Sequence, residues 1–378
     1  MSKSYYSLGL MSGTSGDGVD TSIIQSDGDT QYKVIFDKYF KYTQDIYENI
    51  HNLKDKINNS KDLKNLSKEI ESLEKEITLF HARAVNEIIK ESKSNIDFIG
   101  FHGQTVYHNA KEKISKQLGD GKLLSQLTKK TVIYDFRQND LKNDGQGAPL
   151  TPMFHKLLAY KYKFKIPLTF LNIGGITNLT HIDHLNNLWG WDVGPGNCLI
   201  DQWVRLNSKN KYDQDGKIAR SGKINKIVLN SALESYPEIN SSDDRPKSYD
   251  VKDFDLSFVR GLSLEDGAAT LTEYTAEILT TRLRNTLAGG PSDRAPAGAK
   301  SIVITGGGRK NKLLIKSIRE KMKVPILLID DYGINGDFIE SQAFAYLAIR
   351  SYLKLPISFP ETTGCEKPCT GGIIVKNF

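Results

Sequence analysis

Cysteine is scarce in this sequence and forms no recognisable framework. The chain has three cysteines, Cys198, Cys365 and Cys369, an odd number at spacings that contain no CxxC pair. Such a set does not build a disulfide scaffold. We therefore expect three reduced thiols.

Long apolar runs are also missing. No run approaches the roughly 20 residues that a membrane-spanning helix needs. The opening segment, MSKSYYSLGLMSG, is too short and too polar for a secretory signal, and its apolar part continues directly into a glycine turn. With 39% hydrophobic and 25% charged residues, the composition is that of a globular protein. We expect a soluble, cytoplasmic protein without membrane contact.

The positive charge is not gathered into one stripe. The formal net charge is +6, yet lysines alternate with acids, as in KDLKNLSKEIESLEKEI. Nucleic-acid-binding proteins usually cluster their basic residues on one face. The pattern argues against nucleic-acid binding.

A chain of 378 residues exceeds the size at which one hydrophobic core stops growing, so it predicts two domains with a ligand cleft between them. A helix expected from Ala148 ends shortly before a new strand-glycine-strand unit, which begins after Pro167. We place the first α/β domain at 1–165 and the second at 166–339. In this prediction the C-terminal segment, about 340–378, can belong to the first domain again.

Three glycine-rich turns each follow an apolar run. They are SGTSGDGVD at 12–20, NIGGITN at 172–178 and ITGGGRKN at 304–311. Glycine turns let backbone N–H groups converge on an anion, as in phosphate sites. A single glycine pair is more often an ordinary hairpin, but three such turns together favour a nucleotide.

The first turn also carries side chains suited to a nucleotide with Mg²⁺. Thr14 and Ser15 offer hydroxyls for phosphate oxygens, while Asp17 and Asp20 offer carboxylates for Mg²⁺ or its waters. None of the turns matches the GxxxxGK[ST] loop, and the first joins strand to strand. The arrangement resembles the plan of the actin, hexokinase and Hsp70 superfamily.

Candidate catalytic and sugar-binding residues follow other expected strands. Asp192, in GWDVGPGN, is either a carboxylate exposed at a strand end or a cap of the turn that follows it, and the local sequence does not decide. A short strand from Ile96 to Phe101 is expected to end at HGQT, which offers Gln104 and Thr105 to sugar hydroxyls.

Arg137, in DFR, is a planar donor for a carboxylate or phosphate. Glu340 opens a helix, where it favours the helix dipole or accepts from a sugar. His102 and His108 show no third ligand at a diagnostic spacing, so core or hydrogen-bonding roles are favoured over metal binding.

These residues lie in blocks that resemble one family in their order along the chain. The blocks include GLMSGTSGDGVD, GFHGQTVYH, NIGGITNLT, GWDVGPGNCLID, DGAATLTEYTA and IESQAFAYLAIRSYLKLPISFPETTG. The sequence resembles the anhydro-N-acetylmuramic acid kinases of cell-wall (peptidoglycan) recycling, which are enzymes of amino sugar metabolism. The resemblance implies an α/β, two-domain actin/hexokinase-like (ribonuclease H-like) fold whose interdomain cleft holds nucleotide and sugar.

The resemblance also implies a reaction in which ATP and water open 1,6-anhydro-N-acetylmuramic acid and leave a 6-phosphate. Asp192 would be the general base, and the sugar pocket would contain Gln104, Thr105, Arg137 and Glu340. A homodimer and hinged domain closure are implied as well. The ATP-binding residues would be Gly13, Thr14, Ser15, Gly16, Asp17, Gly18, Val19 and Asp20, together with Gly174, Gly175, Gly306, Gly307 and Gly308 of the two later turns.

Two positions depart from the family pattern. Asp144 stands where the first glycine of GGQGAPL is usual, and Val251 replaces a usual arginine. An acid at 144 would alter a tight turn or repel phosphate if it faced the cleft. The alternatives that stay open are a kinase of another hexose or polyol and a nucleotide-driven binding ATPase like actin or Hsp70.

Overall fold

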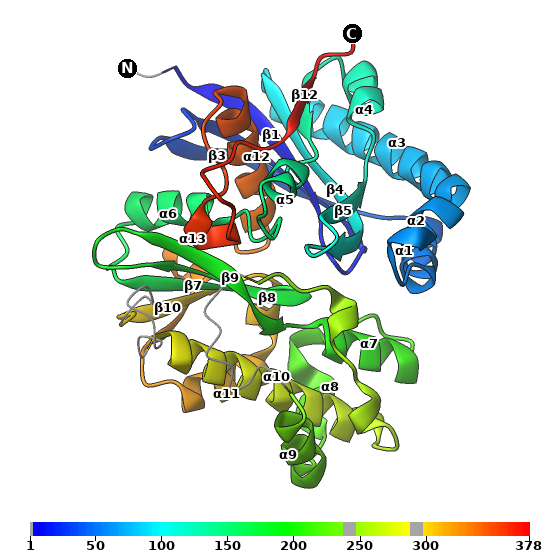
Figure 1. The fold of residues 1–378 in the computed structure, drawn as a ribbon, viewed down its shortest axis with the longest axis vertical. Helices are drawn as coiled ribbons and strands as arrows, with labels where there is room; N and C mark the ends of the chain where they lie inside the picture. The colour runs from blue at the N-terminus through cyan, green and yellow to red at the C-terminus, as the bar shows by residue number, and fades with distance from the viewer. Residues whose placement is uncertain (1–2, 237–246, 288–297) are drawn as a thin grey trace. The chain divides into compact units, whose positions relative to one another are not determined.

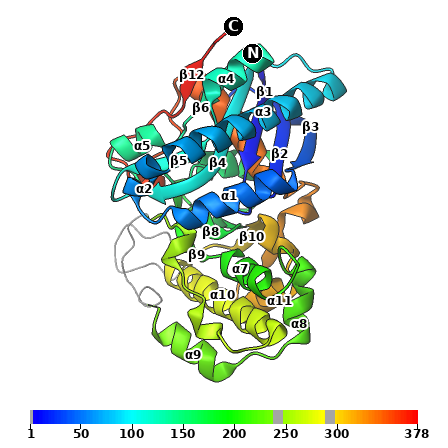
Figure 2. The same cartoon turned by 90° about the vertical axis from the view of Figure 1, so that its right-hand side faces the viewer.

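The computed structural model describes residues 3–236, 247–287 and 298–378. The chain divides into two compact units. Unit 1 contains Met1–Lys163 and Asp337–Phe378, and unit 2 contains Phe164–Gly336. Figure 1 follows the chain through both units, and Figure 2 shows the same elements from the side.

Unit 1 is built on a mixed seven-stranded sheet with the strand order β12-β6-β4-β1-β2-β3, and β5 pairs with β4. Its strands are β1 (Tyr5–Ser12), β2 (Gly18–Ser26), β3 (Tyr32–Lys41), β4 (Phe98–Asn109), β5 (Ile114–Leu118), β6 (Thr131–Tyr134) and β12 (Ile373–Val375). Its helices are α1 (Gln44–Lys56), α2 (Ser60–Asn65), α3 (Ser67–Ser92), α4 (Gly121–Thr128), α5 (Gln138–Lys142), α6 (Pro152–Lys161), α12 (Ile339–Tyr352) and α13 (Pro360–Thr363).

Unit 2 contains a five-stranded sheet with the order β11-β10-β7-β8-β9. Its strands are β7 (Leu168–Ile173), β8 (Ile176–Ile182), β9 (Leu188–Pro195), β10 (Ser301–Thr305) and β11 (Ile326–Leu328). Its α-helices are α7 (Cys198–Asn207), α8 (Lys217–Ser221), α9 (Lys226–Glu234), α10 (Leu264–Leu287) and α11 (Lys312–Lys321). Short 3₁₀ turns are η1 (Gln214–Gly216), η2 (Val251–Asp253), η3 (Ser257–Val259), η4 (Gly307–Lys310) and η5 (Ile329–Tyr332).

The two sheets repeat one topology. In each, three consecutive strands pair antiparallel. A later strand then pairs in parallel with the first of them, β4 with β1 and β10 with β7, and one more strand pairs in parallel with that one, β6 with β4 and β11 with β10. This is the strand order of the ribonuclease H-like fold. The predicted α/β fold class is confirmed.

Helices cover the sheet of unit 1 on opposite faces. The helices α1 and α3 pack with the large apolar core that contains Ile50, Ile77 and Phe101 (Figure 2). Against the other face lies α12, which contacts β1, β2 and β4. In unit 2, α10 and α11 share a core with the strands that includes Leu279 and Leu314.

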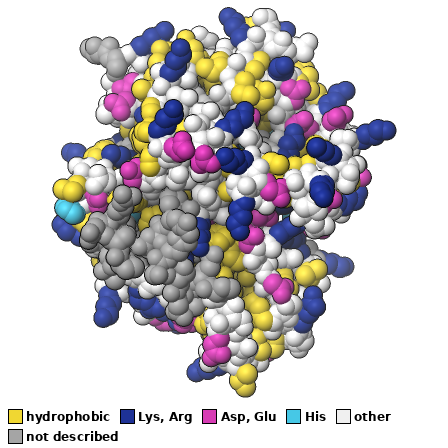
Figure 3. Space-filling model, viewed as in Figure 1, with side chains coloured by type: hydrophobic (Ala, Val, Ile, Leu, Met, Phe, Trp, Pro, Cys, Tyr) yellow, Lys and Arg dark blue, Asp and Glu magenta, His cyan; other side chains and the backbone are white. Residues whose placement is uncertain are grey.

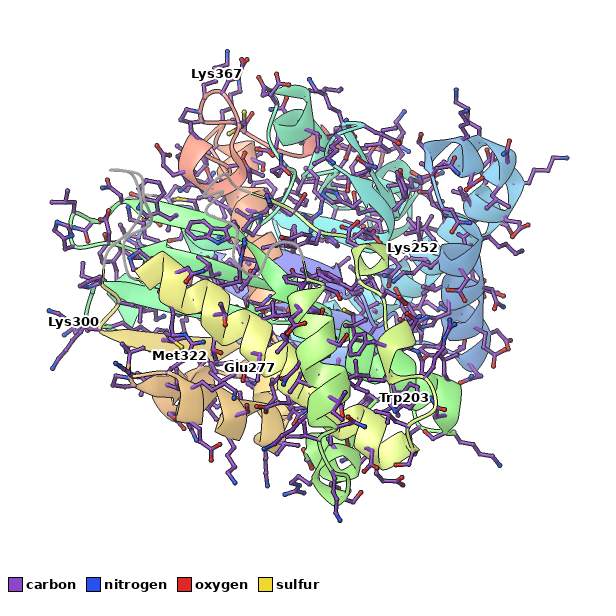
Figure 4. All side chains as sticks on the ribbon, turned by 60° about the horizontal axis from the view of Figure 1, so that its bottom comes forward. Trp203, Lys252, Glu277, Lys300, Met322 and Lys367 are labelled. Carbon is purple, nitrogen blue, oxygen red and sulfur yellow. The ribbon has the colours of Figure 1, made fainter. Side chains whose placement is uncertain are left out.

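Close packing in unit 2 also depends on a tryptophan beside a glycine. The indole of Trp203, on α7, fills the space that a Cβ on Gly267 of α10 would need, and its Nε1 donates to the Leu264 carbonyl at 2.9 Å. Figure 4 shows Trp203 among the helices of this unit. This contact joins α7, which follows the Asp192 strand, to the long helix α10.

The three cysteines are free and buried, in agreement with the expected reduced thiols. Burial raises the pKa of Cys198 to about 12, so its thiolate form is disfavoured. Within the described parts of the chain, no helix is both long and apolar enough to cross a bilayer. Acidic and basic side chains are interspersed on the face shown in Figure 3.

The predicted strand ending at HGQT was too short. The structure continues β4 through Gly103, Gln104 and Thr105 as far as Asn109, because β5 pairs with this half of the strand. Its register shifts between Thr105 and Tyr107, which marks an irregularity in the ladder. Gln104 and Thr105 therefore lie within a strand, and not in a loop after it.

Gly9→Ala should destabilise the protein by about 3 kcal/mol or more, because the new Cβ would overlap the Ser341 carbonyl oxygen of α12. Gly261 is the control: its φ is +88° but the space around it is open, so Gly261→Ala should cost only about 1–2 kcal/mol. Urea unfolding followed by circular dichroism measures both changes. Equal losses in the two variants would contradict the proposed packing constraint.

Candidate active site

The first glycine turn connects β1 to β2 as a tight hairpin. Gly16 adopts a left-handed φ of +60°, and its N–H donates to the Gly13 carbonyl at 3.1 Å. The Ser12 Oγ lies 3.0 Å from the Gly18 carbonyl oxygen across the base of the turn. A Cβ on Gly13 would meet only the Ser15 hydroxyl, at 4.0 Å, so space beside the turn is open there.

Side chains from α1 and β4 donate hydrogen bonds to the carbonyl oxygens of this turn. Gln104 Nε2 donates to the Gly13 carbonyl at 3.0 Å, and Lys54 Nζ donates to the Thr14 carbonyl at 3.1 Å. His51 Nε2 lies 3.0 Å from the Ser15 carbonyl, to which it must donate. A carbonyl oxygen that faced a phosphate would repel it. Because these three carbonyl oxygens accept hydrogen bonds from protein side chains, the turn is suited to binding an anion through its N–H groups.

Gln104 is engaged at both ends of its amide. Its Oε1 accepts from the Ser12 hydroxyl at 2.6 Å while its Nε2 holds the turn. The residue is fully buried. The structure thus places Gln104 as a brace of the glycine turn. Thr105 points elsewhere, since its hydroxyl accepts from Gln117 Nε2 on β5 at 3.2 Å.

The carboxylate of Asp17 closes the turn on its other side. Its Oδ1 accepts from the Ser15 hydroxyl at 2.5 Å, and its Oδ2 accepts from the Tyr39 hydroxyl at 3.1 Å. Asp20 lies further along, on β2, and pairs in register with Met11 and Tyr39. Sequence reasoning missed Tyr39, His51 and Lys54, because only the packing of β3 and α1 brings them to the turn.

Arg137 is held by two acceptors. Its Nη1 donates to the Gly147 carbonyl at 2.6 Å, and its Nη2 lies 3.0 Å from His102 Nε2. His102 Nδ1 lies 2.8 Å from the Gly103 carbonyl, so this nitrogen carries the proton and Nε2 accepts from the arginine. Burial, followed by the charge of Arg137, lowers the pKa of His102 to about 3.

His108 has a similar environment. Its Nδ1 lies 2.9 Å from the Ser115 hydroxyl. Burial and then the Arg137 charge lower its pKa to about 4. Both histidines are therefore neutral hydrogen-bonding residues at physiological pH, which agrees with the interpretation favoured from the sequence.

Asp144 adopts the backbone conformation that a glycine would adopt easily in this turn. It adopts φ +64°, the left-handed region that Asp tolerates better than most residues. Its carboxylate pairs with Lys113 Nζ at 2.6 Å and is about half exposed. The nearby loop is fixed by the buried Asp140, whose Oδ2 accepts from the Gly147 N–H at 2.7 Å and whose Oδ1 accepts from the Thr363 hydroxyl at 2.6 Å.

Glu340 lies half-buried in the first turn of α12. The partial positive charge of a helix N-terminus favours an acid at this position. The residues that follow it, from Ser341 to Ser351, are buried. Glu340 is therefore fixed to the sheet of unit 1 through the helix that it opens.

In unit 2, the second glycine turn is held by backbone groups. The N–H of Gly196 donates to the Gly175 carbonyl at 2.9 Å, and the N–H of Asn197 donates to the Gly174 carbonyl at 2.8 Å. A Cβ on Gly196 would overlap the Gly174 carbonyl. The turn between β7 and β8 is thus fixed to the start of α7.

The third glycine turn opens the path from β10 to α11. Gly306 has φ +75°, and a Cβ there would collide with Asn172 and Ile173 of β7. The Gly306 carbonyl accepts from Nη1 of the buried Arg309 at 2.9 Å. The same guanidinium makes a bidentate pair with Asp330, with Nε–Oδ2 at 2.6 Å and Nη2–Oδ1 at 3.0 Å.

Asp192 lies on β9 and is 5% exposed. Its N–H donates to the Lys247 carbonyl at 3.0 Å, and its Oδ2 accepts from the Tyr249 N–H at 2.9 Å. A donor 57 residues away thus holds the carboxylate. Val251, the second departure, begins η2 just after this donor and packs against the core of Trp203 and Tyr274.

Two ribonuclease H-like sheets, each with a glycine turn after its first strand, define the class of actin- and hexokinase-like ATPase folds. Within that class, the anhydro-N-acetylmuramic acid kinase family matches residues 5–377 of this chain. The chain belongs to the anhydro-N-acetylmuramic acid kinase family.

Relatives of that name cover the whole chain. The chain is 53% identical to the anhydro-N-acetylmuramic acid kinase of Pelagibacter ubique over 382 residues, with 100% of both chains covered. It is 37% identical to that of Zymomonas mobilis over 373 residues, covering 97% of this chain and 98% of the relative.

Among solved structures, component A of (R)-2-hydroxyglutaryl-CoA dehydratase from Acidaminococcus fermentans aligns with a TM-score of 0.46 at 13% identity. The alignment covers 92% of this chain and 99% of that one.

The Asp330–Arg309 pair predicts a pH-dependent loss of stability. Burial raises the pKa of Asp330, but the hydrogen bonds and charge of Arg309 outweigh it and leave the pKa below its ordinary value. A depressed folded-state pKa contributes stability above the unfolded value of about 3.9, and this is lost as the pH falls through the folded value. Because the Asp330 side chain is 45% exposed and water screens the pair, Asp330→Asn should cost only about 1 kcal/mol at pH 7, and the difference from wild type should shrink below about pH 4.

Glu320→Gln is the control for this variant. Glu320 is largely exposed and lies 3.7 Å from Lys316, so its loss should change stability by about 0.5 kcal/mol or less. Urea titrations at pH 7 and pH 3 measure both variants. A pH-independent effect of Asp330→Asn would show that the ion pair does not provide this stability.

Proposed function

We propose that this chain phosphorylates 1,6-anhydro-N-acetylmuramic acid at O6 with ATP while hydrolysing its anhydro ring. The product is N-acetylmuramic acid 6-phosphate. Membership of the family over the full chain length carries the proposal. The supporting feature of the site is a nearly buried carboxylate, Asp192, whose orientation is fixed by the Tyr249 N–H.

Asp192 is the general base in this proposal. It takes a proton from a water molecule whose oxygen bonds to the anomeric carbon, and the bond between that carbon and O6 breaks. The released O6 then accepts the γ-phosphoryl group, and ADP leaves. A kinase active site mainly positions its reactants and stabilises charge, so the carboxylate supplies the one proton acceptor that ring opening needs.

ATP binds through the glycine turns in this proposal. The phosphates lie against residues 13–20, where the carbonyls of Gly13, Thr14 and Ser15 already have partners in the protein. Gly174 and Gly175 contribute the second phosphate turn, and residues 306–308 contact adenosine. Open space beside Gly13 is consistent with close approach of a phosphate.

The sugar is bound by polar groups of unit 1. Arg137, fixed by His102 and the Gly147 carbonyl, is suited to the substrate carboxylate. Thr105 and Glu340 supply further hydrogen-bonding groups. We assign Gln104 a shared role, because its amide holds the phosphate turn at the edge of the proposed sugar site.

Mg²⁺ is proposed to bind with ATP beside Asp20 and Asp17. Among the residues that the structure describes, no group of three His, Cys, Asp or Glu stands together as a metal site. Mg²⁺ bound with a nucleotide needs only one or two carboxylates, since waters and phosphate oxygens complete its shell. The carboxylate of Asp17 is held beside the turn by the Ser15 hydroxyl, and Asp20 lies on the strand that follows the turn. When bound, Mg²⁺ neutralises phosphate charge.

We further propose a cytoplasmic homodimer that acts in cell-wall recycling, with closure of the two domains around the substrates. Two other functions are tested by the same assays. A kinase of another hexose or polyol would phosphorylate open sugars, and an actin- or Hsp70-like ATPase would hydrolyse ATP without a sugar.

The central test compares 1,6-anhydro-N-acetylmuramic acid, N-acetylmuramic acid and glucose as acceptors for ATP. Only the anhydro sugar should react and give a ring-opened 6-phosphate, identified by mass spectrometry. Asp192→Asn should lower kcat about 10²- to 10⁴-fold, because the amide cannot take the proton. Asp45→Asn, an exposed change on α1, is the matched control and should leave kcat unchanged.

Equal turnover of the open sugars would replace the proposal with an ordinary sugar kinase. ATP hydrolysis without any sugar would favour the binding ATPase. Full activity of Asp192→Asn on the anhydro sugar would leave the substrate correct but remove Asp192 as the base.

A metal titration tests the role of Asp20. Asp20→Asn should raise the Mg²⁺ concentration that gives half-maximal rate by about tenfold or more, because one oxygen ligand or its water contact is lost. Removal of Mg²⁺ with EDTA should abolish phosphorylation by the wild type. Asp45→Asn again serves as control, and an unchanged Mg²⁺ requirement in Asp20→Asn would exclude the proposed contact.

A further inference from the structure

Four polar residues stand in register across the sheet of unit 2. Thr305 pairs with Asn172, Asn172 pairs with Asn178, and Asn178 pairs with Asp192. Register partners point to the same face of a sheet. The residues therefore form one polar row over β10, β7, β8 and β9, and Asp192 stands at its end.

The row lies on the face opposite to the core of unit 2. The residues one position earlier on β7 and one later on β8, Leu171 and Leu179, are register partners and belong to the buried cluster shared with α10 and α11. Side chains alternate between faces along a strand. The polar row is thus set apart from the apolar core.

A β-bulge shapes the end of the row. Thr177 pairs with Gly194 and Asn178 pairs with Asp192, so Val193 is an extra residue in β9. A bulge bends its strand and redirects the neighbouring side chains, and such irregularities are frequent beside active sites. Here the bulge places Asp192 opposite Asn178.

Asn178 is the one member of the row whose side-chain oxygen is left without a protein partner in the described residues. Its Oδ1 is a buried atom with no hydrogen bond there, whereas Asn172 Oδ1 accepts from the Thr305 hydroxyl at 3.2 Å. A buried acceptor without a partner is unfavourable unless a water or ligand satisfies it. Its position beside Asp192 points to a water that both residues would share.

We propose that Asn178 and Asp192 together hold the water that opens the anhydro ring, an inference that rests on the proposed function. Cross-strand partners have Cβ atoms about 4.5–5.5 Å apart, a separation that one water can bridge between two short side chains. The water donates one O–H to the Asp192 carboxylate and the other to Asn178 Oδ1. Its lone pair is then directed at the anomeric carbon. The first proton passes to Asp192 as the oxygen–carbon bond forms, and the second stays on the product hydroxyl.

Asn178→Leu is the first test, because leucine has a similar shape and no acceptor. A structural role for the unpartnered oxygen predicts an unchanged or raised Tm and unchanged kcat. A water-holding role predicts an equal or higher Tm together with a kcat about 10- to 100-fold lower and a KM for ATP within about threefold.

Thr177→Val is the matched control. The Thr177 hydroxyl is also buried without a partner in the described part of the chain, but it points to the opposite face of the same strand. Its removal should leave kcat unchanged. A wild-type kcat in Asn178→Leu, or equal losses in both variants, would overturn the inference.

Asn178→Asp gives a second, independent measurement that does not depend on the leucine variant folding. It keeps an acceptor beside Asp192 but adds a like charge, which raises the pKa of the carboxylate pair. The acidic limb of the kcat/KM profile should move up by about one pH unit. An unmoved limb would contradict close approach of the two side chains. A wild type that does not phosphorylate the anhydro sugar would instead refute the proposed function, and this inference with it.

Discussion

The close approach of α12 to the sheet of unit 1 depends on two glycines that are register partners. A Cβ on Gly9 would overlap the Ser341 carbonyl, and a Cβ on Gly100 would overlap the Phe344 carbonyl. Backbone therefore packs on backbone, and the Ser22 and Ser341 hydroxyls bond at 2.6 Å beside this contact. Because β1 leads into the first glycine turn and α12 begins at Glu340, one packing constraint positions both parts of the candidate site within unit 1.

The two units use one topology but stabilise their glycine turns by different means. In unit 1, side chains from α1 and β4 satisfy the carbonyls of the turn, with Lys54 and Gln104 as donors. In unit 2, backbone N–H groups at Gly196 and Asn197 do the same for Gly174 and Gly175. The first arrangement brings positive charge to the proposed phosphate site, and the second places the start of a helix there. Both leave the turn rigid before any anion arrives, which reduces the entropy lost on binding.

Local patterns predicted the features that depend on neighbours in the sequence. The strand-glycine-strand turns, the helix after ITGGG and the ribonuclease H-like fold class follow from apolar periodicity, from glycine and from the family resemblance. The missed features depend on contacts between distant segments. The second half of β4 is a strand because β5 pairs with it, and His51 reaches the Ser15 carbonyl only because α1 packs beside the turn. Tyr249 could not have been connected with Asp192 from spacing alone.

At both positions that depart from the family pattern, the feature that matters is formed by the main chain. Asp144 retains the left-handed conformation that glycine adopts easily, and its carboxylate is paired with Lys113. Val251 follows a segment that holds Asp192 through the Tyr249 N–H, a donor present whatever side chain stands nearby. A hydrogen bond donated by the main chain does not depend on the side chain, as long as the backbone conformation of the segment is unchanged. The packing of the partly buried Val251 against the core that contains Trp203 stabilises this conformation. The strand bulge and the Tyr249 N–H both act on the candidate base through the main chain, so a valine at 251 is compatible with the orientation of the Asp192 carboxylate.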